Sequence, residues 1–410
     1  MASAGKVLVI VENLPVPFDR RVWMECRALS AAGFEVSVIS PKGVGASATR
    51  EVLEGVHVYR HDMPLEADSP LGYLVEYAVA LWREWGLARR VRRERGFGVV
   101  QVCNPPDLLF LVAAWFKFLY GARVVFDHHD ISPELYEAKY GRRDVFYQVL
   151  RLAERLTFAT ADVVIATNES YRAVALGRGH KHPDDVIVVR NAPDLSRFVE
   201  TPPNPAYRRG RRYLVGYVGT MGEQEGIDHL LRAVRIIVRE LGREDISFTV
   251  IGGGPAVEGL RRLTHELGVD GYVEFPGRVS DQELLERLST CDLCVNPDPK
   301  TPFNDASTMT KIMDYMALGK ASVQFDLTEG RRSAGEASVY AAPNDERDLA
   351  RRIVALIDDE ERRARMGLLG RQRMEQSLEW RHQIPRLIAA HARAQARRPW
   401  RSALRRVLRA

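Results

Sequence analysis

The sequence predicts an α/β fold of two Rossmann-like domains, each a doubly wound parallel sheet, facing each other across a cleft. Three observations support this fold class. The chain has 410 residues, more than one hydrophobic core usually serves. Short runs rich in β-branched residues alternate with longer helical patterns, as parallel sheets require. A segment rich in Pro and Arg interrupts this alternation once, after which it starts again.

The first domain is predicted to span residues 1–195. Its expected strands are short apolar runs: Lys6–Val11, Glu35–Ser40, Gly98–Cys103, Ala122–Asp127, Asp162–Thr167 and Asp185–Arg190. Helical patterns lie between them, such as 20–32, which stops at Gly33, and 74–95. Each strand would therefore return to the sheet through a helical crossover.

The second domain is predicted over residues 213–375, after a linker at 196–212. Its expected strands are Tyr213–Gly222, Ile246–Pro255, Tyr272–Gly277, Cys291–Pro297 and Ala321–Asp326. Residues 376–410 are expected to form a helix that returns over the first domain, followed by an Arg-rich tail. The default ligand site in such a pair is the cleft, where the ends of both sets of strands meet.

Charge is balanced overall but concentrated at the C-terminus. The net charge is +5, and residues 381–410 contain nine Arg and no acidic residue. Such a tail is attracted to anionic membranes or to nucleic acid; a solvated helix end with a charged tail explains it equally well. We expect no nucleic-acid partner, and we count an anionic membrane surface among the candidate partners.

The four cysteines do not suggest a disulfide framework. Cys291 and Cys294 have CxxC spacing but lie in a short apolar run without a second pair or a His cluster, which favours core packing. No stretch approaches the roughly 20 apolar residues that span a bilayer. We therefore expect a cytoplasmic protein in a reducing environment.

One predicted helix, residues 308–323, has a narrow polar face. Ser307, Lys311 and Asp314 fall within about 60° of one another on a helix of 3.6 residues per turn. A helix N-terminus with an adjacent ammonium suits a phosphate, and Asp314 one turn later suits the hydroxyls of a ribose. The alternative is an i,i+3 salt bridge on a solvated face, with Ser307 as an N-cap.

Two glycine-rich turns in the same domain favour the phosphate interpretation. Gly219, Gly222 and Gly226 follow the first strand, and 252–254 follow the second. Glycine allows the backbone to approach an anion closely. Neither turn has the dinucleotide or P-loop spacing, so the dehydrogenase and P-loop classes are disfavoured.

These segments together resemble a known family. The motifs in the second half are GTMG, IGGGP, VEFPGRVSDQELLERLSTCDLCVNP and KIMDYMALGKASV. Those in the first half are PFDRRVWMECRALSAAGFEVSVISP, VVFDHHDISPELYEAKYG and VVRNAPDLSRF. In this order they resemble the bacterial retaining glycosyltransferases of family 4, which have the GT-B architecture. The resemblance covers nearly the whole chain.

The resemblance implies a nucleotide-sugar donor held mainly by the second domain. It places Lys311 at the diphosphate and Asp314, where relatives usually have Glu, at the ribose. The family's partner acid would fall on Ala306, so Asn304 or Asp305 is expected to substitute. Other donor contacts are expected from Gly219, Thr220 and Gly222 of the first glycine-rich turn. Arg278 and Ser307, later in the same domain, complete the expected donor site.

The resemblance also implies an acceptor held mainly by the first domain. His129 would lie over the sugar ring and Asp130 would hold it, so His129, Asp130 and Lys311 are the expected catalytic residues. A strand-end turn with Asp130 as an N-cap is the alternative. Asp19 and Arg20 are expected on the acceptor side. No convincing DxD motif is present, so we expect no metal.

The predicted function is transfer of a sugar, with retention, from a nucleotide diphosphate to a lipid-linked or polysaccharide acceptor in bacterial cell-surface glycan synthesis. UDP is the expected nucleotide, by analogy of fold, and no further cofactor is expected. The Arg-rich tail and the aromatic stretch 115–120 suggest a peripheral position at the inner face of the plasma membrane. Two alternatives remain: a sugar-nucleotide epimerase of the same fold, and a non-catalytic sugar-nucleotide-binding partner.

Overall fold

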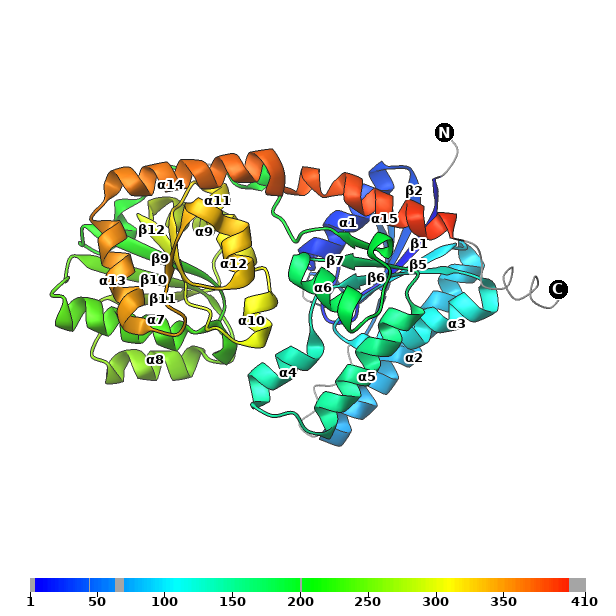
Figure 1. Cartoon of the computed structure of the whole chain (residues 1–410). Coiled ribbons are helices and arrows are strands. Elements are labelled where there is room, and N and C mark those ends of the chain that lie inside the picture. Colours follow the sequence, from blue (N-terminus) through cyan, green and yellow to red (C-terminus); the bar gives the residue numbers. More distant parts are fainter. Residues whose placement is uncertain (1–3, 44, 63–69, 200, 398–410) are drawn as a thin grey trace. The chain divides into compact units, whose positions relative to one another are not determined.

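The computed structural model describes residues 4–43, 45–62, 70–199 and 201–397 (Figure 1). The chain divides into two compact units. Unit 1 comprises the residues up to 137, residues 141–190 and those from 383; unit 2 comprises residues 138–140 and 191–382. Each unit is an α/β domain built on its own sheet, as the sequence predicts.

The sheet of unit 1 has eight strands in the order β3-β4-β2-β1-β5-β6-β7-β8. The strands are β1 (Gly5–Ile10), β2 (Phe34–Pro41), β3 (Arg50–Leu53), β4 (Val56–His61), β5 (Val99–Cys103), β6 (Arg123–His128), β7 (Val163–Ala166) and β8 (Val186–Val188). All neighbouring strands are parallel except β3 and β4. Sequence analysis missed this antiparallel pair. Its turn uses Glu54 and Gly55, both at positive φ, and β3 alternates exposed and half-buried residues instead of forming an apolar run.

Helices cover both faces of this sheet (Figure 1). They are α1 (Arg20–Ala31), α2 (Pro70–Glu94), α3 (Phe110–Tyr120), α5 (Val145–Thr160), α6 (Glu169–Gly177) and α15 (Ile384–Ala396). The short helix α4 (Ser132–Tyr140) follows β6, and its last three residues belong to unit 2. Parallel crossovers are right-handed. The β1-to-β2 crossover therefore places α1 on one face, where α15 also packs, and the crossovers from β4 through β7 place α2, α3 and α5 on the other. Strands β5 and β6, covered on both sides, are buried along their whole length.

The sheet of unit 2 has six parallel strands in the order β11-β10-β9-β12-β13-β14. The strands are β9 (Tyr213–Thr220), β10 (Ile246–Gly253), β11 (Val273–Gly277), β12 (Leu293–Asn296), β13 (Ser322–Phe325) and β14 (Ser338–Ala341). The helices are α7 (Ile227–Arg235), α8 (Val257–Glu266), α9 (Asp281–Thr290), α10 (Pro302–Ala306), α11 (Thr310–Ala317), α12 (Thr328–Ala334), α13 (Glu346–Ile357) and α14 (Glu360–Arg373). Sequence analysis missed only β14, a four-residue edge strand.

Two segments expected outside the domains are packed against them. In the predicted linker, Arg208 forms a salt bridge with Asp292 at 2.6 Å, and Tyr207 stacks under Arg287, all within unit 2. Helix α15 belongs to unit 1 and contacts strands β5 to β8. Residues 398–410, most of the expected Arg-rich tail, lie outside the described residues. No described helix has the length and apolar character needed to cross a bilayer.

Candidate active site

The helix expected from Thr308 begins later than predicted, so its polar face is different. Helix α11 starts at Thr310 with Met309 as its N-cap residue. Ser307 ends the preceding short helix α10, and its hydroxyl donates to the carbonyl of Phe303 at 2.7 Å. The alternative in which Ser307 is the N-cap of the Lys311 helix is therefore wrong. The reason is local: Thr301 caps a separate helical turn, which breaks the pattern before α11 begins.

Lys311 is a buried cation rather than a surface one. Its ammonium lies 2.8 Å from Oε2 of Glu225 and 2.9 Å from Oδ1 of Asp298. The ring of Tyr217 lies 5.1 Å from the same nitrogen. These ion pairs differ from the solvated i,i+3 pair with Asp314 that was the alternative. We call Lys311, Glu225 and Asp298 the unit 2 charge cluster.

The unit 2 charge cluster lies at the topological switch point of its sheet. Glu225 follows β9 and Asp298 follows β12, and these adjacent strands are where the chain changes its direction across the sheet. Open α/β sheets bind ligands outside the carboxyl ends of their strands at this point. The position of the cluster is therefore that of a ligand site.

Burial and mutual charge set the protonation of this cluster. Burial raises the pKa of Asp298 to about 6, although Lys311 opposes this shift. Burial alone would lower the pKa of Lys311, but Asp298, Tyr217 and Glu225 raise it above its ordinary value. The ammonium is consequently charged at neutral pH and is shared by two carboxylates.

The glycines at the strand ends are required by chain packing. A Cβ atom on Gly252 would lie 1.9 Å from the carbonyl oxygen of Gly219, and one on Gly254 would lie 2.5 Å from that of Met221. A Cβ on Gly219 would meet the Tyr217 hydroxyl at 2.9 Å and Cε of Lys311 at 3.4 Å. These glycines let the turns pack, and they bring Lys311 against the end of β9. Their expected role in the close approach of an anion stays a prediction.

The other predicted donor residues of unit 2 differ in exposure. Thr220 and Arg278 are exposed, and Arg278 makes no ion pair with a described residue. Gly222, in contrast, is buried beside the side chain of Gln224. Asp314 is half-buried on α11.

Asn304 and Asp305 already have structural partners. The buried amide of Asn304 donates to the carbonyls of Gln224 and Pro299 at 3.0 and 2.9 Å. The carboxylate of Asp305 accepts from the backbone and hydroxyl of Thr328, at 2.8 and 2.9 Å. Both side chains hold neighbouring segments together. Their expected substitution for the family's partner acid stays a prediction.

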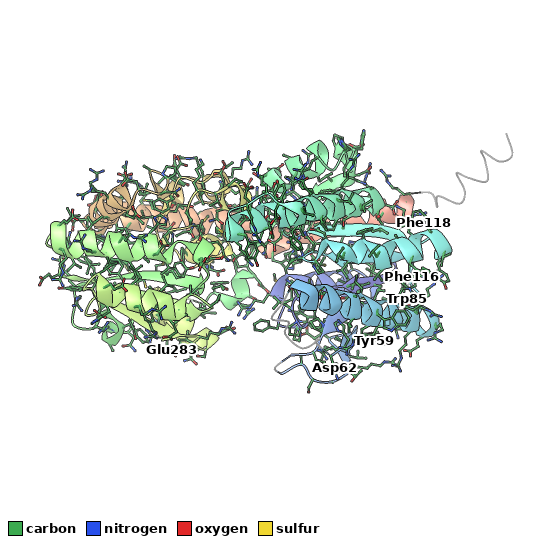
Figure 2. All side chains as sticks on the ribbon, turned by 90° about the horizontal axis from the view of Figure 1, so that it is seen from below. Tyr59, Asp62, Trp85, Phe116, Phe118 and Glu283 are labelled. Atoms are coloured by element: carbon green, nitrogen blue, oxygen red, sulfur yellow. The ribbon has the colours of Figure 1, made fainter. Side chains whose placement is uncertain are left out.

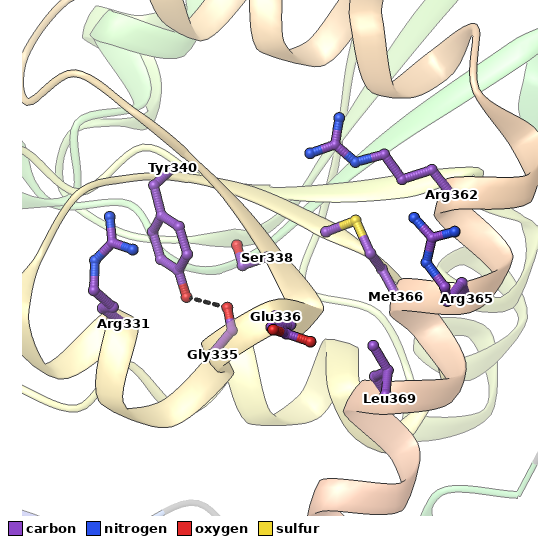
Figure 3. Close-up of a pocket in the computed structure, with 9 residues that line it drawn as sticks. All are labelled: Arg331, Gly335, Glu336, Ser338, Tyr340, Arg362, Arg365, Met366 and Leu369. Atoms are coloured by element: carbon purple, nitrogen blue, oxygen red, sulfur yellow. Dashed lines mark hydrogen bonds between the residues drawn. The ribbon is translucent and has the colours of Figure 1, made fainter.

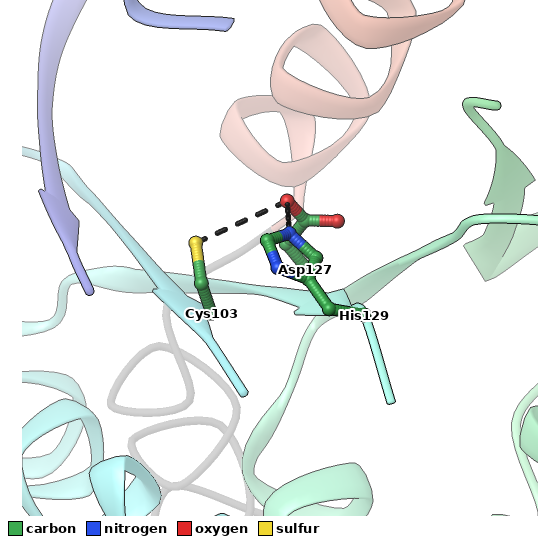
Figure 4. A group of neighbouring side chains, drawn as sticks. All are labelled: Cys103, Asp127 and His129. Atoms are coloured by element: carbon green, nitrogen blue, oxygen red, sulfur yellow. Dashed lines mark hydrogen bonds and ion pairs between the residues drawn. The ribbon is translucent and has the colours of Figure 1, made fainter. Parts of the chain in front are cut away.

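In unit 1, His129 is held by Asp127 and not by Asp130 (Figure 4). Its Nε2 lies 2.5 Å from Oδ2 of Asp127 and 3.0 Å from Nε of Arg21. Among the described residues, its Nδ1 has no hydrogen-bond partner. The prediction that Asp130 orients His129 is wrong, because β6 continues to His128 and directs Asp127 inward.

Asp130 contributes through its backbone. Its amide donates to Oδ1 of Asn104 at 3.2 Å, and its carbonyl accepts from Nδ2 of the same residue at 2.7 Å. The N-cap position of α4 belongs to Ile131, so Asp130 does not occupy it. His128 is buried and packs against Phe126 and Tyr171.

A buried network surrounds the contact between Asp127 and His129. Arg21 pairs with Asp127 at 2.8 Å and with Glu25 at 3.1 Å. Gln101 donates to Glu25 at 2.6 Å. We call Arg21, Glu25, Gln101, Asp127 and His129 the unit 1 polar network. These residues come from α1, β5 and β6, beside the β1/β5 switch point of the sheet.

The unit 1 polar network shifts several pKa values. Burial and the adjacent Asp127 raise the pKa of Glu25 to about 8, so this carboxyl is protonated at neutral pH. Burial opposes ionisation of Asp127, but Arg21 and His129 hold its pKa well below the usual range. Burial likewise opposes a charged His129, but Asp127 raises its pKa above the ordinary value. A histidine that titrates above its usual range beside a fixed carboxylate suits proton handling near neutral pH.

Cys103, Asp127 and His129 meet the distance requirement for a metal site, since their ligand atoms lie within 4.8 Å of one another (Figure 4). Their chemistry does not fit one. Arg21 already occupies the Asp127 carboxylate, and burial raises the pKa of the Cys103 thiol, which stays protonated. A cation here would have to displace a guanidinium.

The acceptor-side residues have different positions. Asp19 is buried and caps the start of α1 by accepting from the amide of Val22 at 3.0 Å. Arg20 is exposed. The residue of this helix that joins the unit 1 polar network is its neighbour Arg21. Sequence reasoning missed Arg21, Glu25 and Asp127, although a charged pair four residues apart on an otherwise apolar helix face was a usable signal.

Comparisons with known proteins agree with the two-domain structure. The "Glycosyltransferase Family 4" model matches residues 19–197, and the "Glycosyl transferases group 1" model matches residues 212–359. The chain is 29% identical over 269 residues to D-inositol 3-phosphate glycosyltransferase of Thermomonospora curvata, covering 60% of this chain and 58% of that protein. It is 31% identical over 115 residues to a GDP-mannose-dependent α-(1-6)-phosphatidylinositol monomannoside mannosyltransferase of Mycobacterium tuberculosis, covering 28% of this chain and 29% of that one. The matches thus span less than two thirds of either relative.

Solved structures share the fold over nearly the full length. Sucrose-phosphate synthase of Thermosynechococcus elongatus superposes with a TM-score of 0.78 and 17% identity, covering 95% of this chain and 98% of that one. HepE of Anabaena, in complex with UDP and glucose, has a TM-score of 0.71 and 16% identity, covering 95% and 99%. These values establish the GT-B fold, as predicted. The two matched domains and this fold make the chain a member of the family 4-type glycosyltransferases.

Proposed function

We propose that this chain transfers a hexosyl group, with retention, from a nucleotide diphosphate to a lipid-linked or polysaccharide acceptor in bacterial cell-envelope glycan synthesis. The observation that carries the proposal is the buried unit 2 charge cluster at the switch point between β9 and β12. A buried ammonium at the carboxyl ends of strands suits the diphosphate of a donor. The family membership supplies the reaction class.

Charge explains how such a site would promote transfer. Cleavage of the bond between sugar and diphosphate builds negative charge on the leaving oxygen, and a fixed cation there stabilises it. In our proposal Lys311 contacts the diphosphate, and Arg278, which has no ion pair among the described residues, adds a second positive charge. Asp298 and Glu225 would hold the ammonium in place before the donor binds.

We further propose that unit 1 supplies the acceptor side. His129 presents Nδ1 while its Nε2 is held by Asp127, so the imidazole has a fixed orientation and one nitrogen for a hydroxyl of acceptor or sugar. The leaving phosphate would take the proton of the acceptor hydroxyl on the same face. No covalent intermediate is needed in this scheme.

The donor base is proposed to be uridine, with guanosine as the competing candidate. HepE is described in complex with UDP and glucose, and the Mycobacterium tuberculosis relative is GDP-mannose-dependent. A thermal-shift series with UDP-glucose, GDP-mannose, ADP-glucose and dTDP-glucose separates the two. A ligand at 100 times its Kd adds about 2.7 kcal/mol to the folded state.

The decisive assay follows sugar release and transfer with the stabilising donor. We expect slow hydrolysis without acceptor, and an α-linked product from an α-linked donor when an extract of lipid-linked acceptors is added. An inverted anomer would contradict retention. Failure of all four donors to raise the melting temperature would contradict the donor site itself.

A second candidate function is a non-catalytic sugar-nucleotide-binding partner. It is favoured by one observation: the charge of Lys311 is already neutralised by Glu225 and Asp298. Under this candidate, donors stabilise the protein but are neither hydrolysed nor transferred. Measurable turnover that is lost in Lys311→Met would exclude it.

A further inference from the structure

Unit 1 exposes an unusual apolar face on α5. Val145, Val149, Leu152 and Leu156 are 41–75% exposed. They recur at i, i+4, i+7 and i+11, which places them within about 60° on the helix. The opposite side of α5 packs against the domain through residues such as Tyr147 and Phe158. The helix therefore has apolar residues on both sides, where an ordinary surface helix has a polar outer side.

The neighbouring helix α3 continues this face. Leu111, Trp115 and Phe118 are 43–50% exposed and share one side of α3, and α3 packs beside α5 on the same face of the sheet. Phe118 is half exposed, whereas Phe116 of the same helix is buried; both are labelled in Figure 2. We call these three residues of α3, together with the four exposed residues of α5 given above, the α3/α5 face. Soluble surfaces rarely gather so many large apolar side chains without a partner.

A tryptophan cluster borders the α3/α5 face. Trp82 and Trp85 of α2 lie 5.1 Å apart, and Trp85 meets Trp115 edge-on at 5.5 Å. Trp82 is 70% exposed. Tryptophan is enriched where one side of a surface meets lipid and the other meets water.

A cationic hollow lies on the other border, along the same helix. This hollow has a volume of about 570 Å³ and is lined by Gln148, Arg151, Leu152, Arg155 and His180 among others. Another cavity, of about 510 Å³, lies in unit 2. Arg151 and Arg155 are exposed and make no ion pair within the described part of the chain. The nearby carboxylate of Glu154 is held by Arg178 at 2.5 Å. Leu152 belongs to both the hollow and the apolar face.

We propose that the α3/α5 face docks on an anionic lipid bilayer, with Arg151 and Arg155 binding lipid phosphate. Apolar side chains beside unpaired arginines match the acyl boundary and the headgroup layer of such a surface. A second copy of the chain fits less well. If this face met itself, the unpaired arginines of both copies would be brought together without acidic partners.

This inference deepens the proposed use of a lipid-linked acceptor, and it rests on that function for its purpose. Docking can nevertheless be measured without donor or turnover. The full chain is floated with vesicles of phosphatidylcholine alone and with vesicles that contain about 40% phosphatidylglycerol. We expect binding to the anionic vesicles that weakens as salt rises.

Two pairs of substitutions test the two parts of the surface. Val149→Glu with Leu152→Glu, and Arg151→Glu with Arg155→Glu, are each expected to reduce vesicle binding at least about tenfold. The matched controls are Leu368→Glu, an exposed leucine of unit 2, and Arg362→Glu with Arg365→Glu, which line the other cavity (Figure 3). These controls should bind like the unmodified chain, and circular dichroism checks that every variant is folded.

Several results would overturn the proposal. Vesicle binding that is equal in all variants, or absent in the unmodified chain, contradicts it. So does a dimer in light scattering that Val149→Glu dissociates, since the face would then bind a second copy. Donor-induced thermal stabilisation with transfer to a detergent-solubilised acceptor, but without vesicle binding, would reject the docking surface and leave the proposed function intact.

Discussion

Lys311 and Asp298 form a buried ion pair, with Nζ of the lysine 2.9 Å from Oδ1 and 3.1 Å from Oδ2 of the aspartate. Only 9% of the lysine side chain and 1% of the aspartate side chain are exposed. A charge taken out of water is stabilised only if its partner stays in place. The pair therefore links the stability of unit 2 to the chemistry proposed for it, and the two effects must be separated experimentally.

Removing the Lys311 ammonium should slow transfer strongly and lower the free energy of unfolding. For Lys311→Met we expect kcat to fall by roughly 100- to 1000-fold and the free energy of unfolding by about 3–5 kcal/mol, since the buried carboxylate of Asp298 and the half-buried one of Glu225 lose their cation. Urea unfolding and donor hydrolysis measure the two quantities. Adding Asp298→Asn should restore part of the stability but none of the activity; recovery of activity would contradict a role at the diphosphate.

The carboxylate of Asp127 should control the titration of His129. Asp127 raises the pKa of the imidazole against the effect of burial. In Asp127→Asn, the limb of the kcat/KM profile that reports His129 should therefore move to lower pH, by about one unit or more. His129→Gln should lack this limb altogether. A limb that stays in place in both variants would mean that His129 does not take part.

Glu25 should make unit 1 less stable as pH rises. Its pKa is about 8 in the folded chain against an ordinary value of 4.5. Between these values the folded state holds a proton that the unfolded state has lost, so stability falls as pH increases through this window and levels off above it. Glu25→Gln should flatten the dependence in urea unfolding from acidic to mildly alkaline pH. Glu35→Gln, at a more exposed position, should keep it.

Substitutions of Asp314 and Ser307, both in unit 2, should affect different quantities. If Asp314 binds the ribose, Asp314→Asn should raise KM for the donor about tenfold, the equivalent of about 1.4 kcal/mol, with kcat little changed. Ser307→Ala should leave KM unchanged and lower stability by about 1 kcal/mol, because its hydroxyl bonds to the Phe303 carbonyl. Equal KM values in both variants would remove Asp314 from the donor site.

Metal removal should not affect transfer. Arg21 occupies the carboxylate that a cation would need in the group of Cys103, Asp127 and His129. After dialysis against EDTA we expect kcat to stay within about twofold of its starting value, with or without added Mg²⁺. A tenfold loss that Mg²⁺ or Mn²⁺ reverses would contradict this expectation.

The fold was largely predictable because its signals are local. Buried strands such as β5 and β6 appear as continuous apolar runs, and each is bounded by helical patterns. Three strands were missed. β3 and β14 have only four residues each and lie at sheet edges, where no continuous apolar pattern is needed. β4 lies inside the sheet, but its sequence, VHVYRH, mixes polar with apolar residues and has no continuous apolar run.

The sites were less predictable because their contacts connect distant segments. Lys311 could be selected from a helix pattern, but its partner Glu225 lies 86 residues away. Arg21 and Asp127 are separated by 106 residues. For pairs this far apart in the sequence, neither segment indicates which buried charge it will meet. The choice of Asp130 over Asp127 failed for this reason, since the inward direction of Asp127 depends on where β6 ends.

Helix α15 belongs to unit 1 but is synthesised after unit 2. Residues 383–396 contact strands β5 to β8, although the rest of this domain ends near residue 190. During synthesis on the ribosome, α1 could already cover one part of that side of the sheet, but the part over β5 to β8 that α15 contacts would lack this helix until unit 2 had been translated. Premature termination near residue 380 would expose that apolar side in a nascent chain, and such products should depend on chaperones or be degraded.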